Sequence, residues 1–270
     1  SDPDIILMHD AFPLIDSTYR WVPSFVLAFA RISALLFMFP YFGYASVSHR
    51  VRVFFGLVLT LFVLPSIGQV DIAMDINAFQ LIGLIIKEIA IGLFIGFGGL
   101  IVFEMFSLAG TLAGRQMGLA MAQILDPAHL NRSSLVGQFW SMSMMVGFIG
   151  LGFHLFLIKT IIHNFQYIPL TTGHFPSALG EIYVQTGSDV FYTAFQLAAP
   201  AIVFMMMVDT AIALMARIQP TLPIFLIVLP VKIMLGLFIL TISLEIFQTL
   251  AISLMEDSKS LILGIMNQIA

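Results

Sequence analysis

The stretch that decides the fold is Lys87–Pro127, KEIAIGLFIGFGGLIVFEMFSLAGTLAGRQMGLAMAQILDP. Seven of the 20 glycines of the chain lie between Gly92 and Gly118. Gly110, Gly114 and Gly118 recur at every fourth position, so in a helix they share one face. A face without side chains lets a neighbouring helix approach closely, and such small-residue stripes are common packing surfaces in membranes.

Two properties of this stretch argue against a simple spanning helix. Glu104 and Arg115 are charged, and each glycine in a helix costs roughly 1 kcal/mol relative to alanine. We therefore expect a bent or re-entrant element that is buried in protein, because irregular backbone is tolerated at membrane depth only in such a setting.

The composition is that of an integral membrane protein. Hydrophobic residues make up 60% of the chain, charged residues only 10%, and the mean hydropathy is +1.03, whereas soluble domains carry about 25% charged residues. The 270 residues leave room for roughly six spans of ~20 residues. The predicted fold class is an all-α polytopic membrane protein with about six hydrophobic helical segments around the central glycine-rich element.

The order of apolar and polar runs predicts the organisation of the chain. We expect apolar helices over residues 21–39, 53–67, 81–103, 133–158, 190–216 and 233–255, and the central glycine-rich element over residues 105–125. Residues 159–189 are predicted to form an external polar loop with room for a short helix, and residues 217–232, with three prolines, a turn region. By the positive-inside rule, the loops with Arg50 and Arg52 and with Arg217 and Lys232 are cytoplasmic.

Nine charged residues lie within or beside the apolar runs: Arg31, Lys87, Glu88, Glu104, Arg115, Asp209, Arg217, Lys232 and Glu245. A charge at the bilayer centre costs about 2.5–3.5 kcal/mol, so these residues either line a water-filled path or are paired within protein. Arg31 is interpreted either as a packing charge paired inside the helix bundle or as a gating residue. Lys87 and Glu88 are adjacent and do not face each other on a helix, so each is expected to have a partner elsewhere.

Recognisable catalytic chemistry is absent from the sequence. There is no zinc-protease, nucleophile-elbow or P-loop motif, no cysteine, and no basic run that would indicate nucleic-acid binding. His154 and His163 are not spaced to share a helical face as metal ligands. An enzyme, a metal site and a cofactor are therefore not predicted. Two classes remain, a small-solute transporter and a subunit of a larger membrane assembly, and a transporter would often show paired broken helices. A single glycine-broken element favours the assembly.

The segment Gly114–Leu119, GRQMGL, with Ala122 and Asp126-Pro127, resembles the G-x-Q-M-G-L…A…D-P signature of the FliR family of flagellar type III export-gate proteins. Arg31, Pro40, Gly43 and Arg50 also resemble the N-terminal pattern of that family. The chain departs from the pattern at Arg115, where family members tend to be apolar. It departs again at residues 217–222, where the family's R-x-x-P-Q-x-N looks rearranged.

The resemblance implies one copy of the chain in a helical export gate with several FliP and FliQ subunits, and with FlhB on the cytoplasmic side. Residues 1–189 would be a FliP-like part and residues 190–270 a FliQ-like helical hairpin. The gate would lie in the bacterial inner membrane within the flagellar basal body, extend toward the periplasm and pass unfolded rod, hook and filament proteins. The subunit itself would catalyse nothing and hold no cofactor.

The glycine-rich stretch is the predicted gate. An apolar constriction with glycine hinges suits a pore plug, and the plug residues are predicted to be Phe103, Phe106, Leu108, Gly110, Gly114, Gln116, Met117 and Gly118. Ordinary helix packing is the alternative for these residues. We expect Glu104, Arg115 and Asp126 to hold the closed gate through ion pairs, unless Arg115 simply faces water. The remaining predicted assembly or gate charges are Arg31, Lys87, Glu88, Asp209 and Arg217.

Overall fold

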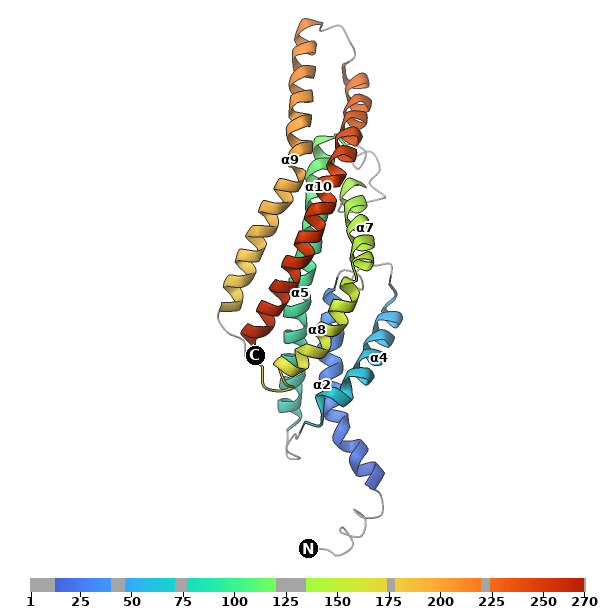
Figure 1. The fold of residues 1–270 in the computed structure, drawn as a ribbon, viewed down its shortest axis with the longest axis vertical. Coiled ribbons are helices and arrows are strands. Elements are labelled where there is room, and N and C mark those ends of the chain that lie inside the picture. The colour runs from blue at the N-terminus through green and yellow to red at the C-terminus, as the bar shows by residue number, and fades with distance from the viewer. Residues whose placement is uncertain are drawn as a thin grey trace, which may run out of the picture. The chain divides into compact units, whose positions relative to one another are not determined.

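The computed structural model describes residues 13–39, 47–70, 77–119, 135–173, 178–219 and 224–269. Every regular element within these residues is a helix, which confirms the predicted all-α class. In chain order the helices are α2 (Pro13–Met38), α4 (His49–Ile67), α5 (Ala78–Gln116), α7 (Leu135–Gly150), α8 (Phe153–Tyr167), α9 (Ala178–Ile218) and α10 (Ile224–Ile269) (Figure 1).

Four of these helices are long and apolar enough to cross a membrane, over Trp21–Met38, His49–Ile67, Ala78–Gln116 and Gly180–Ile218. The pair α7 and α8 can form one more span, broken by a bend of 70°. The chain is therefore a polytopic membrane protein, as its composition predicts. Part of α10, Val228–Ser243, is a shorter apolar stretch.

The chain divides into two compact units that cut across the order of the sequence. Unit 1 contains Ser1–Leu100, His154–Gly180 and Ser260–Ala270, and unit 2 contains Ile101–Phe153 and Glu181–Lys259. Two helices, α5 and α10, contribute long parts to both units, and the boundary also cuts α8 after its first residue and α9 after its first three.

Glycines on α5 bring the backbones of unit 1 into close contact. A side chain at Gly92 would collide with the carbonyl oxygen of Arg31 on α2. A Cβ atom at Gly96 would lie 2.8 Å from the carbonyl oxygen of Leu35, which is also on α2. Gly98 leaves room for Ile265 in the last part of α10. The glycines of α5 thus act as packing surfaces for two other helices.

This packing explains why the described part of α5 differs from the predicted bent element. The helix is continuous from Ala78 to Gln116, through the predicted interruption near residue 104. The penalty of roughly 1 kcal/mol for each helical glycine is offset by the dispersion contacts that a close backbone approach allows. The helix ends where Gly118 adopts a left-handed φ of +79°, a conformation that glycine adopts without steric cost.

Unit 2 is assembled around the second half of α5. A Cβ atom at Gly110 would lie 2.5 Å from the Cα atom of Gly137, so α5 and α7 touch backbone to backbone. The ring of Phe103 packs edge-on against Phe148, with ring centroids 5.4 Å apart. Met117 fills the space that the missing side chain of Gly236 leaves on α10.

Three other predictions of helix limits are wrong. The uncharged run 133–158 is not one helix, since the chain turns after α7 and Gly152 takes a φ of +71°. The predicted polar loop 159–189 is largely helical, because α8 continues to Tyr167 and α9 begins at Ala178. The predicted turn 217–232 is shorter, since α10 begins at Ile224 and includes Pro230. Polar residues of α8 lie on a helix with one buried face, and their polarity alone does not mark a loop.

Candidate functional site

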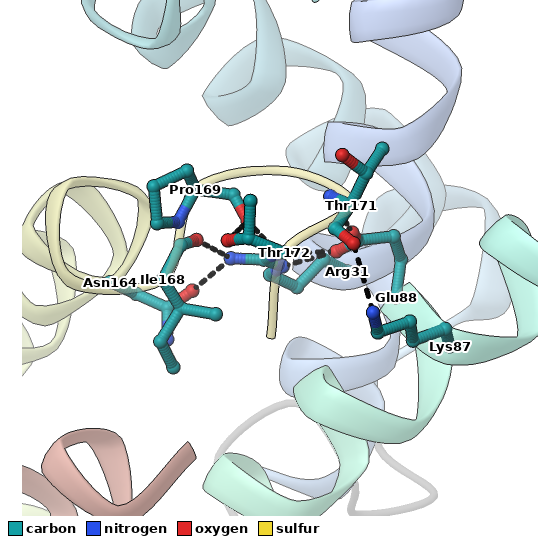
Figure 2. A network of polar contacts seen from close by, with 8 residues as sticks. All are labelled: Arg31, Lys87, Glu88, Asn164, Ile168, Pro169, Thr171 and Thr172. Carbon is teal, nitrogen blue, oxygen red and sulfur yellow. Dashed lines mark hydrogen bonds and ion pairs between the residues drawn. The ribbon is translucent and has the colours of Figure 1, made fainter. Parts of the chain in front are cut away.

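A buried ion pair joins α2 and α5 in unit 1. The Nε atom of Arg31 donates to Oε2 of Glu88 over 2.5 Å, and Figure 2 shows the two side chains meeting. The side chains are 1% and 0% exposed. Each group therefore depends on the other for its charge, because removing one partner would leave an isolated buried ion.

The guanidinium group of Arg31 also holds the end of α8. Its Nη1 atom donates to Oδ1 of Asn164 over 2.9 Å and to the carbonyl oxygen of Ile168 over 2.6 Å. Its Nη2 atom lies 3.5 Å from the carbonyl oxygen of Pro169, and its Cζ atom lies 4.8 Å from the ring centroid of Phe165. Arg31 thus caps the carbonyl group of Ile168 at a helix end, whereas the carbonyl group of Pro169 also accepts from the backbone N–H and the hydroxyl of Thr172.

Glu88 and Lys87 fix the turn that follows α8. Oε1 of Glu88 accepts from the backbone N–H of Thr171 over 2.9 Å, and Nζ of Lys87 donates to the carbonyl oxygen of Thr171 over 2.9 Å (Figure 2). Thr171 has a φ of +73°, which is unfavourable for a β-branched residue. The two neighbouring charges have partners elsewhere in the chain: both bind Thr171 in this turn, and Glu88 also pairs with Arg31 on α2.

The network ties three distant segments of the sequence together and leaves Arg31 and Glu88 sealed from solvent. This arrangement suits a fixed structural joint. The role of Arg31, Lys87 and Glu88 in assembly or gating stays a prediction.

A polar stripe runs along the second half of α5 in unit 2. Glu104 and Arg115 are exposed, and they lie about three helical turns apart on the same face. Ser107, Leu108 and Thr111 lie between them on that face and are half-buried. Among the described residues, neither Glu104 nor Arg115 has a hydrogen bond or an ion pair.

The opposite face of the same helical segment is packed inside unit 2. The predicted plug residues on this face are buried: Phe103, Phe106, Gly110, Gly114 and Met117. The other three, Leu108, Gln116 and Gly118, are half-buried. The structure therefore brings the predicted plug residues onto one short segment and divides them between two faces.

The remaining predicted charges lie apart from this segment of α5 along the chain. Asp209 on α9 pairs with Lys232 on α10 over 2.6 Å, and Lys232 is 15% exposed. Arg217 is exposed in the last turn of α9. Asp126 lies outside the described residues, as do the motif residues Ala122 and Pro127. No group of three or more histidines, cysteines or acidic residues that could hold a metal ion occurs in the described residues.

Four residues that matter to these sites were not singled out from the sequence. Asn164 and Thr171 complete the buried network, and Gly137 and Gly236 receive α5 and Met117. A helix predicted over residues 157–168 would have indicated that Asn164 is buried. On such a helix, Asn164 shares one face with three other residues that are buried in the structure: Leu157, Thr160 and Ile161. Nothing in the sequence marks Gly137 or Gly236 as contact positions.

Known bacterial proteins match this chain along nearly its whole length. Residues 22–258 match the family model described as Bacterial export proteins, family 1. The chain is 27% identical to the flagellar biosynthetic protein FliR of Pectobacterium carotovorum, over 93% of this chain and 95% of that one. It is 30% identical to FliR of Caulobacter vibrioides, over 81% of this chain and 87% of that one. It is also 32% identical to the Yop proteins translocation protein T of Yersinia pestis, over 64% and 67% of the two chains. The predicted resemblance is confirmed, and the chain belongs to the FliR family of bacterial export proteins.

Proposed function

We propose that this chain is a path-lining subunit of a type III export gate, and that the segment 103–118 closes the path. The polar stripe of α5, with Glu104 and Arg115 at its ends, carries the proposal. Relatives named as flagellar biosynthetic and translocation proteins support the same class of function.

The charges of the stripe argue for water or protein beside it. Facing lipid, Glu104 and Arg115 would each cost about 2.5–3.5 kcal/mol at the bilayer centre. Neither residue is paired within the described part of the chain. The exposed face therefore lines an aqueous path or meets another subunit, while the buried face, with Phe103 and Met117, anchors the segment in unit 2.

The lengths of the helices support an assembly that extends beyond the membrane. Helices α5, α9 and α10 contain 39, 41 and 46 residues. At ~1.5 Å per residue they are about 60–70 Å long, roughly twice the thickness of the hydrocarbon core. Unless the helices are strongly tilted, long parts of them lie outside the lipid and can be surrounded by other subunits.

The partners follow from the family. We propose one copy of the chain with FliP and FliQ subunits, FlhB on the cytoplasmic side, and unfolded exported proteins as substrates. Residues 1–189 would be the FliP-like part and residues 190–270 the FliQ-like hairpin, in the bacterial inner membrane of the flagellar basal body and extending toward the periplasm. The hairpin of α9 and α10, which the ion pair between Asp209 and Lys232 joins, supports the assignment of residues 190–270.

The stripe can be tested by site-specific crosslinking, because the chain has no cysteine. Single cysteines at Leu108 and Thr111 probe the exposed face of α5, and cysteines at Ala109 and Ala113 on the buried face are matched controls. In the complex with FliP and FliQ, we expect an export substrate stalled in transit to crosslink at positions 108 and 111 only. Equal crosslinking on both faces, or none with normal export, would contradict the proposed path.

Native mass spectrometry separates this function from a small-solute transporter. A transporter should purify alone as a monomer or a symmetric oligomer. A gate subunit should be recovered as one copy in a larger asymmetric complex when FliP and FliQ are co-expressed. A homogeneous homomer that moves a solute into liposomes would refute the export gate.

A further inference from the structure

The N-terminal end of α4 concentrates basic side chains. His49 and Arg50 are exposed, and the first turn contains no acidic residue. Arg52 is only 9% exposed, its guanidinium lies 5.4 Å from the ring centroid of Phe37, and its Nε atom has no hydrogen-bond partner. None of the three basic side chains forms an ion pair within the described residues.

An open apolar hollow lies directly beside this basic end. It has a volume of about 440 Å³ and is lined by His49, Arg50, Val53, Phe54 and Leu57. Phe54 is 68% exposed, and the exposed apolar surface of α4 continues to Phe62, which is 78% exposed. The helix therefore presents a cationic end followed by an apolar face.

We propose that this surface binds an anionic phospholipid, with the phosphate group beside the exposed Arg50, the buried charge of Arg52 adding to the attraction, and an acyl chain along Phe54. The occupant must be anionic at one end and apolar beyond it, which matches the charge and hydropathy of the helix. α4 is also one of the helices long and apolar enough to span a membrane, and a helix of that length that crosses the bilayer ends at the depth of the lipid headgroups. Basic residues near a membrane surface attract anionic lipids by about fivefold in affinity for each charge.

Photo-crosslinking from Phe54 tests the proposal. A benzophenone amino acid replaces Phe54 in the complete complex, which is placed in nanodiscs with equal amounts of phosphatidylglycerol and phosphatidylcholine. We expect adducts with phosphatidylglycerol to exceed those with phosphatidylcholine by about fivefold or more. Arg50→Gln should lower this preference by about fivefold, and Arg50→Gln combined with Arg52→Gln should abolish it.

Two controls make the result decisive. The same probe at Phe62, on the same helix but far from the basic end, should capture both lipids equally, and its adduct yield reports whether a variant is still inserted and folded. Lys159→Gln removes an exposed basic residue elsewhere, on α8, and should leave the preference at Phe54 unchanged. Equal capture of both lipids at Phe54, or adducts with a protein chain, would overturn the proposal.

Discussion

The ion pair between Arg31 and Glu88 provides a quantitative test of what holds unit 1 together. Both side chains are essentially inaccessible to solvent, and their contact is 2.5 Å long. Glu88→Leu leaves a buried guanidinium without its counter-ion, and Arg31→Met leaves a buried carboxylate. Each single substitution should lower the free energy of unfolding by about 3–5 kcal/mol.

The double variant should be more stable than the sum of the single effects predicts. It contains no buried charge, and its remaining penalty comes from three groups that lose a partner: Oδ1 of Asn164, the carbonyl of Ile168 and the N–H of Thr171. Each unsatisfied buried group costs about 1–3 kcal/mol. We therefore expect a loss of about 3–9 kcal/mol for the double variant, against a sum of about 6–10 kcal/mol for the two single variants. The coupling energy between the two positions is then about 2 kcal/mol.

The assay is reversible unfolding in detergent micelles by increasing denaturing detergent, followed by circular dichroism. The Asp209–Lys232 pair is the matched control, because Asp209 is 44% exposed and partly exposed pairs contribute about 0–1 kcal/mol. Additive effects of the Arg31 and Glu88 substitutions, within about 0.5 kcal/mol, would refute the inference that the two charges depend on each other.

Three further predictions concern a glycine contact, a strained turn and a charge of the stripe. Gly110→Ala would place a Cβ atom 2.5 Å from the Cα atom of Gly137 and should destabilise the protein by about 1–3 kcal/mol. Gly83→Ala, on the same helix with nothing within 4 Å, should be neutral or stabilising by up to about 1 kcal/mol. Thr171→Gly should raise the melting temperature slightly, because it relieves a left-handed conformation of about 1–2 kcal/mol and keeps both backbone hydrogen bonds; a lower melting temperature would contradict this. Arg115→Ala should leave complex yield normal but make membranes containing the closed complex leaky to ions, and an unchanged conductance would argue against a gate role for this residue.

The sequence predicted the fold class and the family correctly, but not the course of the individual helices. The all-α membrane class follows from composition, and the family follows from the residues around Gln116. The continuity of α5 could not be predicted, because the helical penalty of a glycine is local whereas its compensation comes from partners far away in the sequence. Gly92 is matched by a backbone carbonyl of Arg31, and Gly110 by Gly137.

The contacts within the sites could not be predicted from the sequence for the same reason, because the partners lie far away along the chain. The sequence indicates that Glu88 and Arg31 need partners, but the network is completed by Asn164 and by carbonyl groups of a turn, and carbonyl groups carry no sequence signal. The predicted plug residues were chosen for their apolar character. The structure adds that α5 has two faces there, and that the polar face, from Glu104 to Arg115, is the exposed one.

The composition of unit 1 has a consequence for the biosynthesis of the protein. Its core includes contacts of Gly98 with Leu261 and Ile265, and of Gly173 with Ile269. A ribosome that adds ~5–20 residues per second needs on the order of 10–30 s to proceed from residue 100 to residue 260. During that interval the first helices have been made, but the C-terminal segment that packs against their glycines has not. Completion of unit 1 is therefore a late event after insertion, and chaperones or partner subunits that shield these glycines meanwhile would act on the newly made chain.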